Sequence, residues 1–551
     1  MQTEKAGILP THCEQFAKEI RGDTFRTTTV VPADEFKTHF QKLLTVTLDS
    51  ASFNSELVAI QVPQLDCPIE LDEVYSAISL SKNLKTPAAF DNVDRNALFH
   101  KLSALGISTK MVDVIKTLYC DTAAAVWDGI GSTEFFSTNK GVRQGCVLSA
   151  LLFVLFLNDL HAYLPVGLLI EGQTLNILLY ADDIVLLSDN PDKLKQLINS
   201  FIAYCNNWNL KVNLAKSEIV IFRNGGRRAA SEKWFFNDTE ITVANHYKYL
   251  GVVFNYNMSW DEHLNNRLSS SKNSINSTWS KPLRNKYVQH STKFKIYDAA
   301  SRSIMLYCGQ VWGYRERSQL EKLQRFFIKR CFLLPDNTPN YALHIETGLP
   351  KAFLTTLKLH FSYIRKTISL SNDRLPRILS EAVIRKSIFW AKEWLDLFHE
   401  TWNGLHSILL CKLNEKHWSE ATTKANLSQF HDEYCNFLYT GVPNYFDDTN
   451  PRDMISLIFK ARCGLLSINE RAFHGDTNGI CTLCNLDASE NTFHFIGICP
   501  IFKGYRLKFL GNYVLSHSQL LNILNGNCYD NLYLYLKAAL KYRYLILNEF
   551  S

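Results

Sequence analysis

Long hydrophobic segments are missing from this 551-residue sequence. Its most apolar stretch, Ser149–Leu160, is shorter than the roughly 20 apolar residues that span a bilayer, and it ends in polar Asn158 and Asp159. The N-terminal segment has no apolar run of the kind found in secretory signal peptides. We therefore expect a soluble, intracellular protein with no membrane partner, and the sequence leaves open whether it resides in the nucleus or the cytoplasm.

The sequence also lacks repeats, low-complexity tracts and a strong excess of charge. Its formal net charge is only +6, which does not by itself indicate a nucleic-acid partner. The charge is unevenly distributed, however, because the segment Lys281–Arg330 holds twelve Lys or Arg and three Asp or Glu. Such a basic, mostly helical segment suits a polyanion. The alternative is a set of solvated helix faces, which the sequence favours equally.

The 14 cysteines are spread along the chain rather than packed into a small disulfide framework. In a thiol-reduced protein, clustered cysteines indicate a metal site. One such cluster has the spacing Cys481-x2-Cys484-x9-His494-x4-Cys499. Four soft ligands suit tetrahedral Zn²⁺, and a closed set of four indicates a structural ion. The alternative is four unrelated residues.

The most informative stretch is Leu175–Ser188, which reads LNILLYADDIVLLS. Two short apolar runs joined by a tight polar link predict a β-hairpin of buried strands. Asp182 and Asp183 would lie at its tip, where adjacent carboxylates near a core need a cation or a donor. Mg²⁺, which takes oxygen ligands, is the expected ion. The alternative is an ordinary Asp-Asp turn on the surface.

The flanking segments predict a mixture of helices and strands. Asp91 is expected to cap a helix, because carboxylates favour the N-cap position. A glycine-flanked loop, Gly141–Cys146, precedes a strongly apolar helix over Leu148–Leu164. Further strands are predicted over Leu210–Leu214, Glu218–Phe222 and Tyr247–Phe254, and nearly continuous helix from Asp261 to about Tyr445.

Five ordered motifs resemble those of the reverse transcriptases of LINE-type non-LTR retrotransposons. They read AFDNVDR, GVRQGCVLSALLFVLFLNDL, LLYADDIVLLS, LKVNLAKSEIVIF and YKYLGVVF, and the Cys/His cluster resembles that family's C-terminal knuckle. The resemblance implies an α+β fold with a right-hand polymerase palm. Its expected parts are an N-terminal remnant (1–84), the palm (85–257), a helical thumb (258–335), a helical connector (336–450) and a zinc-knuckle module (451–551).

The resemblance implies RNA-directed DNA polymerisation by two-metal nucleotidyl transfer, with Mg²⁺, an RNA template, a DNA primer or target, and deoxynucleotide triphosphates. Asp182 and Asp183 match two of the family's three metal-binding carboxylates. Lys216 matches the residue proposed to protonate the leaving pyrophosphate. The nucleotide pocket is matched by Phe90, Arg143, Gln144 and Gly145, and the primer grip by Tyr249, Leu250 and Gly251. As alternatives, Phe90 and Tyr249 are core residues and Lys216 is a surface lysine.

The sequence departs from the family at the first catalytic aspartate. The family places that residue six positions before the aspartate of its AFD motif, where this chain has Lys85. The stretch Lys82–Pro87 also directly abuts Ala88, so the fingers segment is missing, either by deletion or by a misjoined gene model. Loss of one carboxylate and a cation near the metals predict that polymerase activity is impaired or lost. The alternative is a non-catalytic nucleic-acid-binding remnant that uses the basic helices and the zinc knuckle.

Overall fold

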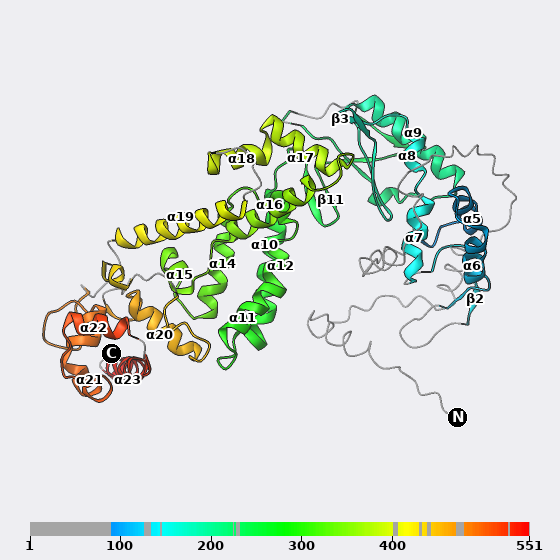
Figure 1. The fold of residues 1–551 in the computed structure, drawn as a ribbon. Helices are drawn as coiled ribbons and strands as arrows, with labels where there is room; N and C mark the ends of the chain where they lie inside the picture. Colours follow the sequence, from blue (N-terminus) through cyan, green and yellow to red (C-terminus); the bar gives the residue numbers. More distant parts are fainter. Residues whose placement is uncertain are drawn as a thin grey trace. The chain divides into compact units, whose positions relative to one another are not determined.

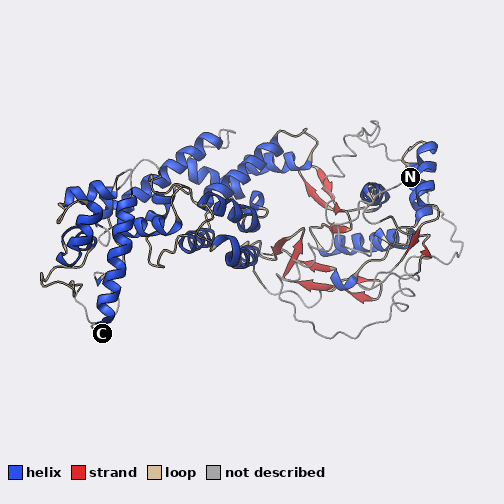
Figure 2. Ribbon diagram, turned by 90° about the horizontal axis from the view of Figure 1, so that it is seen from below, coloured by secondary structure: helices blue, strands red, loops and turns tan. Residues whose placement is uncertain are grey.

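The computed structural model describes residues 90–125, 134–143, 146–223, 225–226, 232–399, 406–428, 432–437, 442–469, 479–526 and 529–549. The chain divides into two compact units, with the boundary between Ser259 and Trp260 (Figure 1). Every strand of the described residues lies in the first unit, whereas the second unit is helical (Figure 2). The predicted N-terminal remnant lies outside the described residues. No described helix combines the length and apolar character needed to cross a membrane.

The first unit combines helices with short antiparallel hairpins. Its helices are α5 (Arg95–Ala104), α6 (Thr109–Tyr119), α7 (Val147–Phe156), α8 (Leu160–Tyr163) and α9 (Pro191–Asn207). Its strands are β1 (Ala123–Ala124), β2 (Phe136–Ser137), β3 (Leu168–Ile170), β4 (Gln173–Leu175), β5 (Ile177–Tyr180), β6 (Asp183–Leu186), β7 (Glu218–Val220), β8 (Phe235–Phe236), β9 (Thr239–Glu240), β10 (Thr242–Ala244), β11 (His246–Tyr249) and β12 (Val252–Asn255).

The cap of α5 differs from the predicted one. The Asp94 carboxylate accepts hydrogen bonds from the backbone N–H groups of Asn96 and Ala97, at 2.8 and 3.0 Å. Asp94, not Asp91, is therefore the N-cap, and the prediction for Asp91 was wrong. Both residues suit a cap by type, so only the fold decides between them.

The predicted helix over Leu148–Leu164 is broken into α7 and α8. The break follows from a tertiary contact, because the buried Lys101 ammonium donates to the Phe156 carbonyl at 2.8 Å and to the Asp159 carboxylate at 2.6 Å. The Tyr204 hydroxyl also contacts Asp159, at 2.7 Å. Burial lowers the pKa of Lys101 to about 8, although Asp159 raises it. A lysine on α5 thus fixes where the apolar helix α7 ends.

The hairpin prediction is confirmed, but not the burial of its strands. β5 and β6 pair antiparallel, with Tyr180 opposite Asp183. Leu178, Leu179 and Tyr180 are exposed, at 39, 40 and 54% of their surface. The reason is the size of the sheet, since the described residues supply only these two strands to it.

Two other strand predictions also need correction. Leu210–Leu214 forms no strand, because the Leu210 N–H donates to the Cys205 carbonyl at the end of α9 and a 3₁₀ turn begins at Leu214. Tyr247–Phe254 is not one run but the hairpin of β11 and β12. The predicted strand at Glu218 is confirmed as β7, which pairs parallel with β10.

The described part of the second unit is built mainly from helices. They are α10 (Asp261–Thr278), α11 (His290–Tyr297), α12 (Ser303–Met305), α13 (Gly309–Trp312), α14 (Ser318–Cys331), α15 (Asn340–Thr347), α16 (Ala352–Ile368), α17 (Leu375–Lys386), α18 (Phe389–Phe398), α19 (His406–Asn426), α20 (Arg452–Arg462), α21 (Lys503–Leu510), α22 (His517–Leu524) and α23 (Asp530–Glu549). Its larger hydrophobic core includes buried residues between Leu264 and Ala539, and a second core joins α16, α18 and α19 through residues such as Phe361, Trp394 and Leu413. The subdivision into thumb, connector and zinc module stays a prediction.

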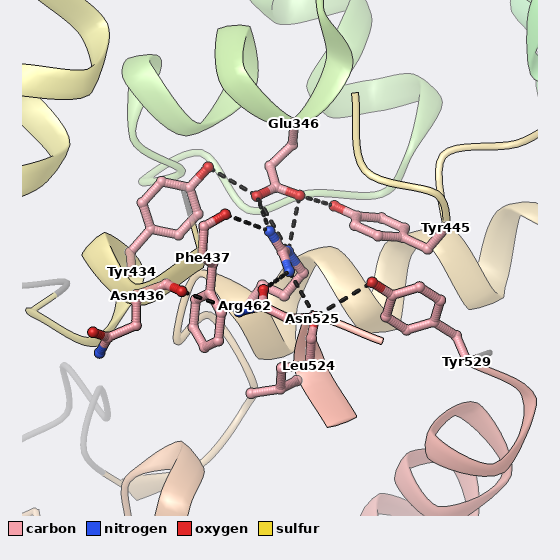
Figure 3. Close-up of polar contacts among 9 residues, drawn as sticks. All are labelled: Glu346, Tyr434, Asn436, Phe437, Tyr445, Arg462, Leu524, Asn525 and Tyr529. Atoms are coloured by element: carbon pink, nitrogen blue, oxygen red, sulfur yellow. Dashed lines mark hydrogen bonds and ion pairs between the residues drawn. The ribbon is translucent and has the colours of Figure 1, made fainter. Parts of the chain in front are cut away.

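A fully buried ion pair joins distant parts of this second unit. The Arg462 guanidinium on α20 donates to both carboxylate oxygens of Glu346 on α15, at 3.0 and 3.2 Å from Nε (Figure 3). Both side chains have no exposed surface. The hydroxyls of Tyr434 and Tyr445 also donate to Glu346. Burial and then Glu346 raise the pKa of both tyrosines well above its ordinary value, so both phenols remain donors.

Arg462 also binds backbone groups from two other segments. Its Nη1 donates to the Leu524 carbonyl at 2.6 Å, and its Nη2 donates to the Phe437 carbonyl at 3.0 Å (Figure 3). Burial lowers the pKa of Arg462, but Glu346, together with Tyr445 and Tyr434, outweighs burial and raises it overall. The guanidinium therefore stays charged and connects α15, the 432–437 turn, α20 and the end of α22.

We predict that Glu346→Ala destabilises the protein by about 3–5 kcal/mol, because it leaves the Arg462 charge buried without a counterion. Chemical denaturation followed by circular dichroism measures the loss. The matched control is Glu420→Ala, whose carboxylate lies 4.0 Å from Lys351 on the surface and whose removal should cost less than about 1 kcal/mol. Equal losses in the two variants would contradict this account.

Candidate active site and Cys/His cluster

Asp182 and Asp183 lie at the turn of the β5–β6 hairpin. The two-residue link Ala181-Asp182 requires Ala181 to adopt a φ of 51°, in the left-handed region that residues with a Cβ rarely occupy. Partial burial raises the pKa of Asp183, and the adjacent Asp182 carboxylate raises it further. A carboxylate whose ionisation is opposed by burial and by a neighbouring negative charge favours a bound cation.

The β11–β12 hairpin brings the predicted primer grip close to these carboxylates. Its link consists of Leu250 and Gly251, with φ values of 47° and 78°. Positive φ at both positions is the requirement of a type I′ turn, which matches the twist of the flanking strands. Burial raises the pKa of Tyr247 and Tyr249, and the Asp183 charge raises both further. The structure therefore brings Tyr249 and Asp183 within electrostatic reach of each other.

The predicted nucleotide-pocket segments also lie side by side. The N–H groups of Gly141 and Val142 donate to the carbonyls of Val93 and Phe90, at 2.8 and 2.9 Å. Gly141 has a φ of 82°, and a Cβ there would lie 2.9 Å from the Asp91 backbone. Only glycine allows this approach, which explains the Gly141 of the GVR motif.

Phe90 lies in the core of the first unit, as its alternative interpretation predicted. Its ring is 7% exposed and lies 4.6 Å from that of Phe153, centroid to centroid. Arg143 and Lys216 are both exposed, Lys216 at the end of the 3₁₀ turn Leu214–Lys216. Gln144 and Gly145 lie outside the described residues. The catalytic and binding roles of all these residues stay predictions.

Arg95 is a structural residue that sequence reasoning missed. Its buried guanidinium donates to the carbonyls of Gly141 and Thr138, both at 2.9 Å, and to that of Lys140 at 3.1 Å. Burial lowers the pKa of Arg95, but the carbonyl acceptors satisfy its donors. Arg95 thereby fixes the start of the Gly141–Cys146 loop (the GVR loop) against α5. A single arginine after a cap residue carries no periodic signal that could have revealed this role.

The described residues bring no third His, Cys, Asp or Glu side chain close enough to Asp182 and Asp183 to form a three-ligand group. Lys85, which occupies the position of the family's first aspartate, lies outside the described residues. The carboxylate pair is therefore suited to hold a divalent ion through two side chains, fewer than the three that the resemblance implies.

The Cys/His cluster is assembled as its spacing predicts. The ligand atoms of Cys481, Cys484, His494 and Cys499 lie within 4.8 Å of one another, and all four residues are buried. A tetrahedral ion with metal–sulfur bonds of about 2.3 Å sets its ligands about 4 Å apart, so this geometry fits one ion. A backbone hydrogen bond helps to hold Cys481 in this position, since the Cys481 N–H donates to the Ala488 carbonyl at 2.9 Å.

Burial makes ionisation of the Cys499 thiol unfavourable. Burial, followed by the charges of Cys481 and Cys484, raises the pKa of Cys499 to about 12. A bound divalent ion reverses this effect, because thiolates rather than thiols are its ligands. The Nδ1 atom of His494 is buried with no hydrogen-bond partner among the described residues, while its Nε2 lies 3.5 Å from the Cys484 Sγ.

A second buried ion pair supports the cluster from outside. The Arg543 guanidinium on α23 donates to both oxygens of Glu490, at 2.9 and 2.6 Å. Glu490 also accepts from the Asn469 N–H at 2.8 Å, and its Oε1 lies 3.9 Å from the Cys481 Sγ. These outer contacts orient the ligand-bearing loop.

Comparison with known proteins agrees with this architecture. Residues 84–254 match the family described as reverse transcriptase (RNA-dependent DNA polymerase). The chain thus carries a reverse transcriptase domain.

The domain is of the non-LTR retrotransposon type, as the motifs predicted. The chain is 30% identical over 244 residues to the RNA-directed DNA polymerase from mobile element jockey of Drosophila funebris, covering 43% of this chain and 26% of that protein. It is 25% identical over 302 residues to a Retrovirus-related Pol polyprotein from type-1 retrotransposable element R2 of Popillia japonica, covering 52% and 41%. The match thus spans about a quarter of the jockey polymerase.

We predict that Asp182→Asn lowers the pKa of Asp183, because it removes the neighbouring negative charge that opposes ionisation. Burial should still hold that pKa above the ordinary value of 3.8. The measurement is a carbon-13 NMR titration of the carboxyl groups. As control, Asp189→Asn removes an exposed carboxylate that pairs with Lys193 and should leave the pKa of Asp183 unchanged. An unchanged pKa in Asp182→Asn would refute the coupling.

Proposed function

We propose that this chain is a reverse-transcriptase protein whose capacity for RNA-directed DNA polymerisation is impaired or lost. The observation that carries the proposal is the carboxylate pair on the β5–β6 turn, which has no third ligand among the described residues. Two-metal transfer needs ligands that fix both ions relative to the primer end and the triphosphate. A pair of carboxylates from one turn supplies too few of them.

The rest of the proposed site follows the palm arrangement of the family. Asp182 and Asp183 would hold Mg²⁺, which would activate the primer hydroxyl and neutralise charge on the triphosphate. Tyr249, Leu250 and Gly251 would position the primer beside Asp183. Phe90 and the loop at Arg143 would bound the sugar and phosphates of the nucleotide, and Lys216 would protonate the pyrophosphate. Lys85 would oppose metal binding, because a cation stands where the family has an aspartate.

Primer extension tests the proposal directly. With an RNA template, a DNA primer, Mg²⁺ and deoxynucleotides, we expect the full chain to extend the primer no faster than its Asp182→Ala variant. The physical reason is the missing positioning and charge stabilisation, which usually make the largest contributions to catalysis. Extension well above background that disappears in Asp182→Ala, but persists in the exposed control Asp189→Ala, would overturn the proposed impairment.

A second candidate function is non-catalytic binding of nucleic acid. It is favoured by the basic segment Lys281–Arg330, of whose twelve Lys and Arg residues six lie on α11 and α14. Phosphate contacts from such a segment would supply most of the affinity, so binding should weaken steeply with salt. A salt titration with labelled RNA and DNA measures this dependence, and undetectable binding at low salt would exclude the candidate.

We further propose that the Cys/His cluster holds one structural Zn²⁺. Purified protein should then contain about one zinc per chain by elemental analysis. Changing both Cys481 and Cys484 to Ser should abolish the zinc and lower the melting temperature, because the ion joins the segment of Cys481 and Cys484 to that of His494 and Cys499. The control is the double change of the exposed Cys411 and Cys435 to Ser, which should retain it. Zinc retained without Cys481 and Cys484 would refute the assignment.

A further inference from the structure

A cavity of about 190 Å³ in the second unit lies outside both groups of residues described above. It is formed where the beginnings of two helices meet, α11 at His290 and α20 at Arg452, and both of these residues line it. Helix N-termini carry partial positive charge. The cavity is several times the volume of about 30 Å³ that a water molecule occupies in the liquid, so it has room for a polyatomic ligand.

Lys293 is the unusual residue of this cavity. Its side chain lines the cavity but is only 1% exposed. Its ammonium has no hydrogen-bond partner among the described residues. Burial lowers the pKa of Lys293 and the Arg452 charge lowers it further, although Cys331 and Asp453 act in the opposite direction. An unpaired buried ammonium is costly unless a ligand supplies the missing acceptors.

The other charges that line the cavity favour an anion. Lys286 and Arg452 add two cations, while Asp448 is the carboxylate of the lining. Asp448 is already engaged, because it accepts from the Ser291 N–H at 2.9 Å and lies 3.1 Å from the His290 Nδ1. Arg452 contacts Asp453 at 3.1 Å and donates to the Arg284 carbonyl at 2.7 Å, which fixes its guanidinium beside the cavity.

The exposed aromatic ring of Tyr287 lies beside these cations. Tyr287 lines the cavity, yet its side chain is 82% exposed. The Asn285 side chain accepts from the Tyr287 N–H at 2.9 Å, which orders this turn, and the Lys286 ammonium lies 5.0 Å from the centre of the ring. An ordered, solvent-facing ring beside cations is the arrangement on which nucleic-acid bases stack.

We propose that this cavity binds a phosphate group of single-stranded nucleic acid, with Lys293 and Arg452 contacting the phosphate and Tyr287 stacking on an adjacent base. The inference rests on the nucleic-acid binding proposed above but requires neither polymerase activity nor the carboxylates of the first unit. It gives a specific role to Lys293, which a general basic surface would not need.

The test uses the full chain, without Mg²⁺ or deoxynucleotides, and a labelled single-stranded RNA of about ten nucleotides. Lys293→Met should weaken binding about tenfold and reduce the magnitude of the salt slope by about one, because one phosphate contact is lost. Tyr287→Ala should weaken binding at least about fivefold, and Tyr287→Phe should bind like the unaltered chain. Lys392→Met is the control and should bind like the unaltered chain, since Lys392 is exposed on α18, lies outside the basic segment and does not line the cavity.

Thermal melting distinguishes a lost ligand contact from a damaged fold. Lys293→Met should raise the melting temperature of the free protein, because it removes a buried charge without a partner. Inorganic phosphate should stabilise the unaltered chain but not Lys293→Met. Weakened RNA binding together with a lowered melting temperature would indicate misfolding and overturn the proposal.

Two further outcomes separate the possible sources of the phosphate. If Lys293→Met abolishes stabilisation by inorganic phosphate but leaves RNA binding unchanged, the cavity serves a free phosphate and the proposed strand contact is wrong. If Lys293→Met changes neither, the cavity is not an anion site. Failure of the wider nucleic-acid function would look different, because the unaltered chain itself would then bind no RNA at low salt.

Discussion

The helical unit depends on one buried charge pair, that of Glu346 and Arg462. Removing both ions from water costs several kcal/mol, and this cost is offset only when nearly all of their donors and acceptors are hydrogen-bonded. Those partners come from segments far apart in the sequence, so the pair forms only when α15, α20, the 432–437 turn and the end of α22 are all in place (Figure 3). A hydrophobic contact would tolerate small shifts among these segments, whereas this network tolerates few. The pair therefore specifies one arrangement of the unit.

The first unit, which contains Asp182 and Asp183, also uses buried cations to fix distant segments. Arg95 binds the carbonyls of the GVR loop, and Lys101 binds the carbonyl at the end of α7. Both residues lie on α5, directly after the AFD motif, and both face segments more than forty residues away. The GVR loop and the end of α7 are thus both positioned by buried cations of α5.

Sequence pattern correctly predicted the elements that are determined by residues close together in the chain. The apolar runs around Asp182 predicted the hairpin, and the spacing of Cys481 and Cys484 predicted the assembled cluster. The errors arose where a distant contact decides the outcome. Lys101 breaks the apolar helix, and the absence of a third strand in the described sheet exposes Leu178. Arg95 and Lys293 escaped prediction because a buried cation is recognised by its surroundings, which no short stretch of sequence contains.

The contact between Arg543 and Glu490 has a consequence for the order in which the protein matures. The four residues of the Cys/His cluster precede α23 in the chain, so they leave the ribosome before the arginine that orients their loop. Until α23 docks, Glu490 lacks its counterion and the loop of Cys481 lacks its outer support. Ordering of the Cys/His cluster is thereby tied to completion of the helical core rather than to synthesis of its four residues.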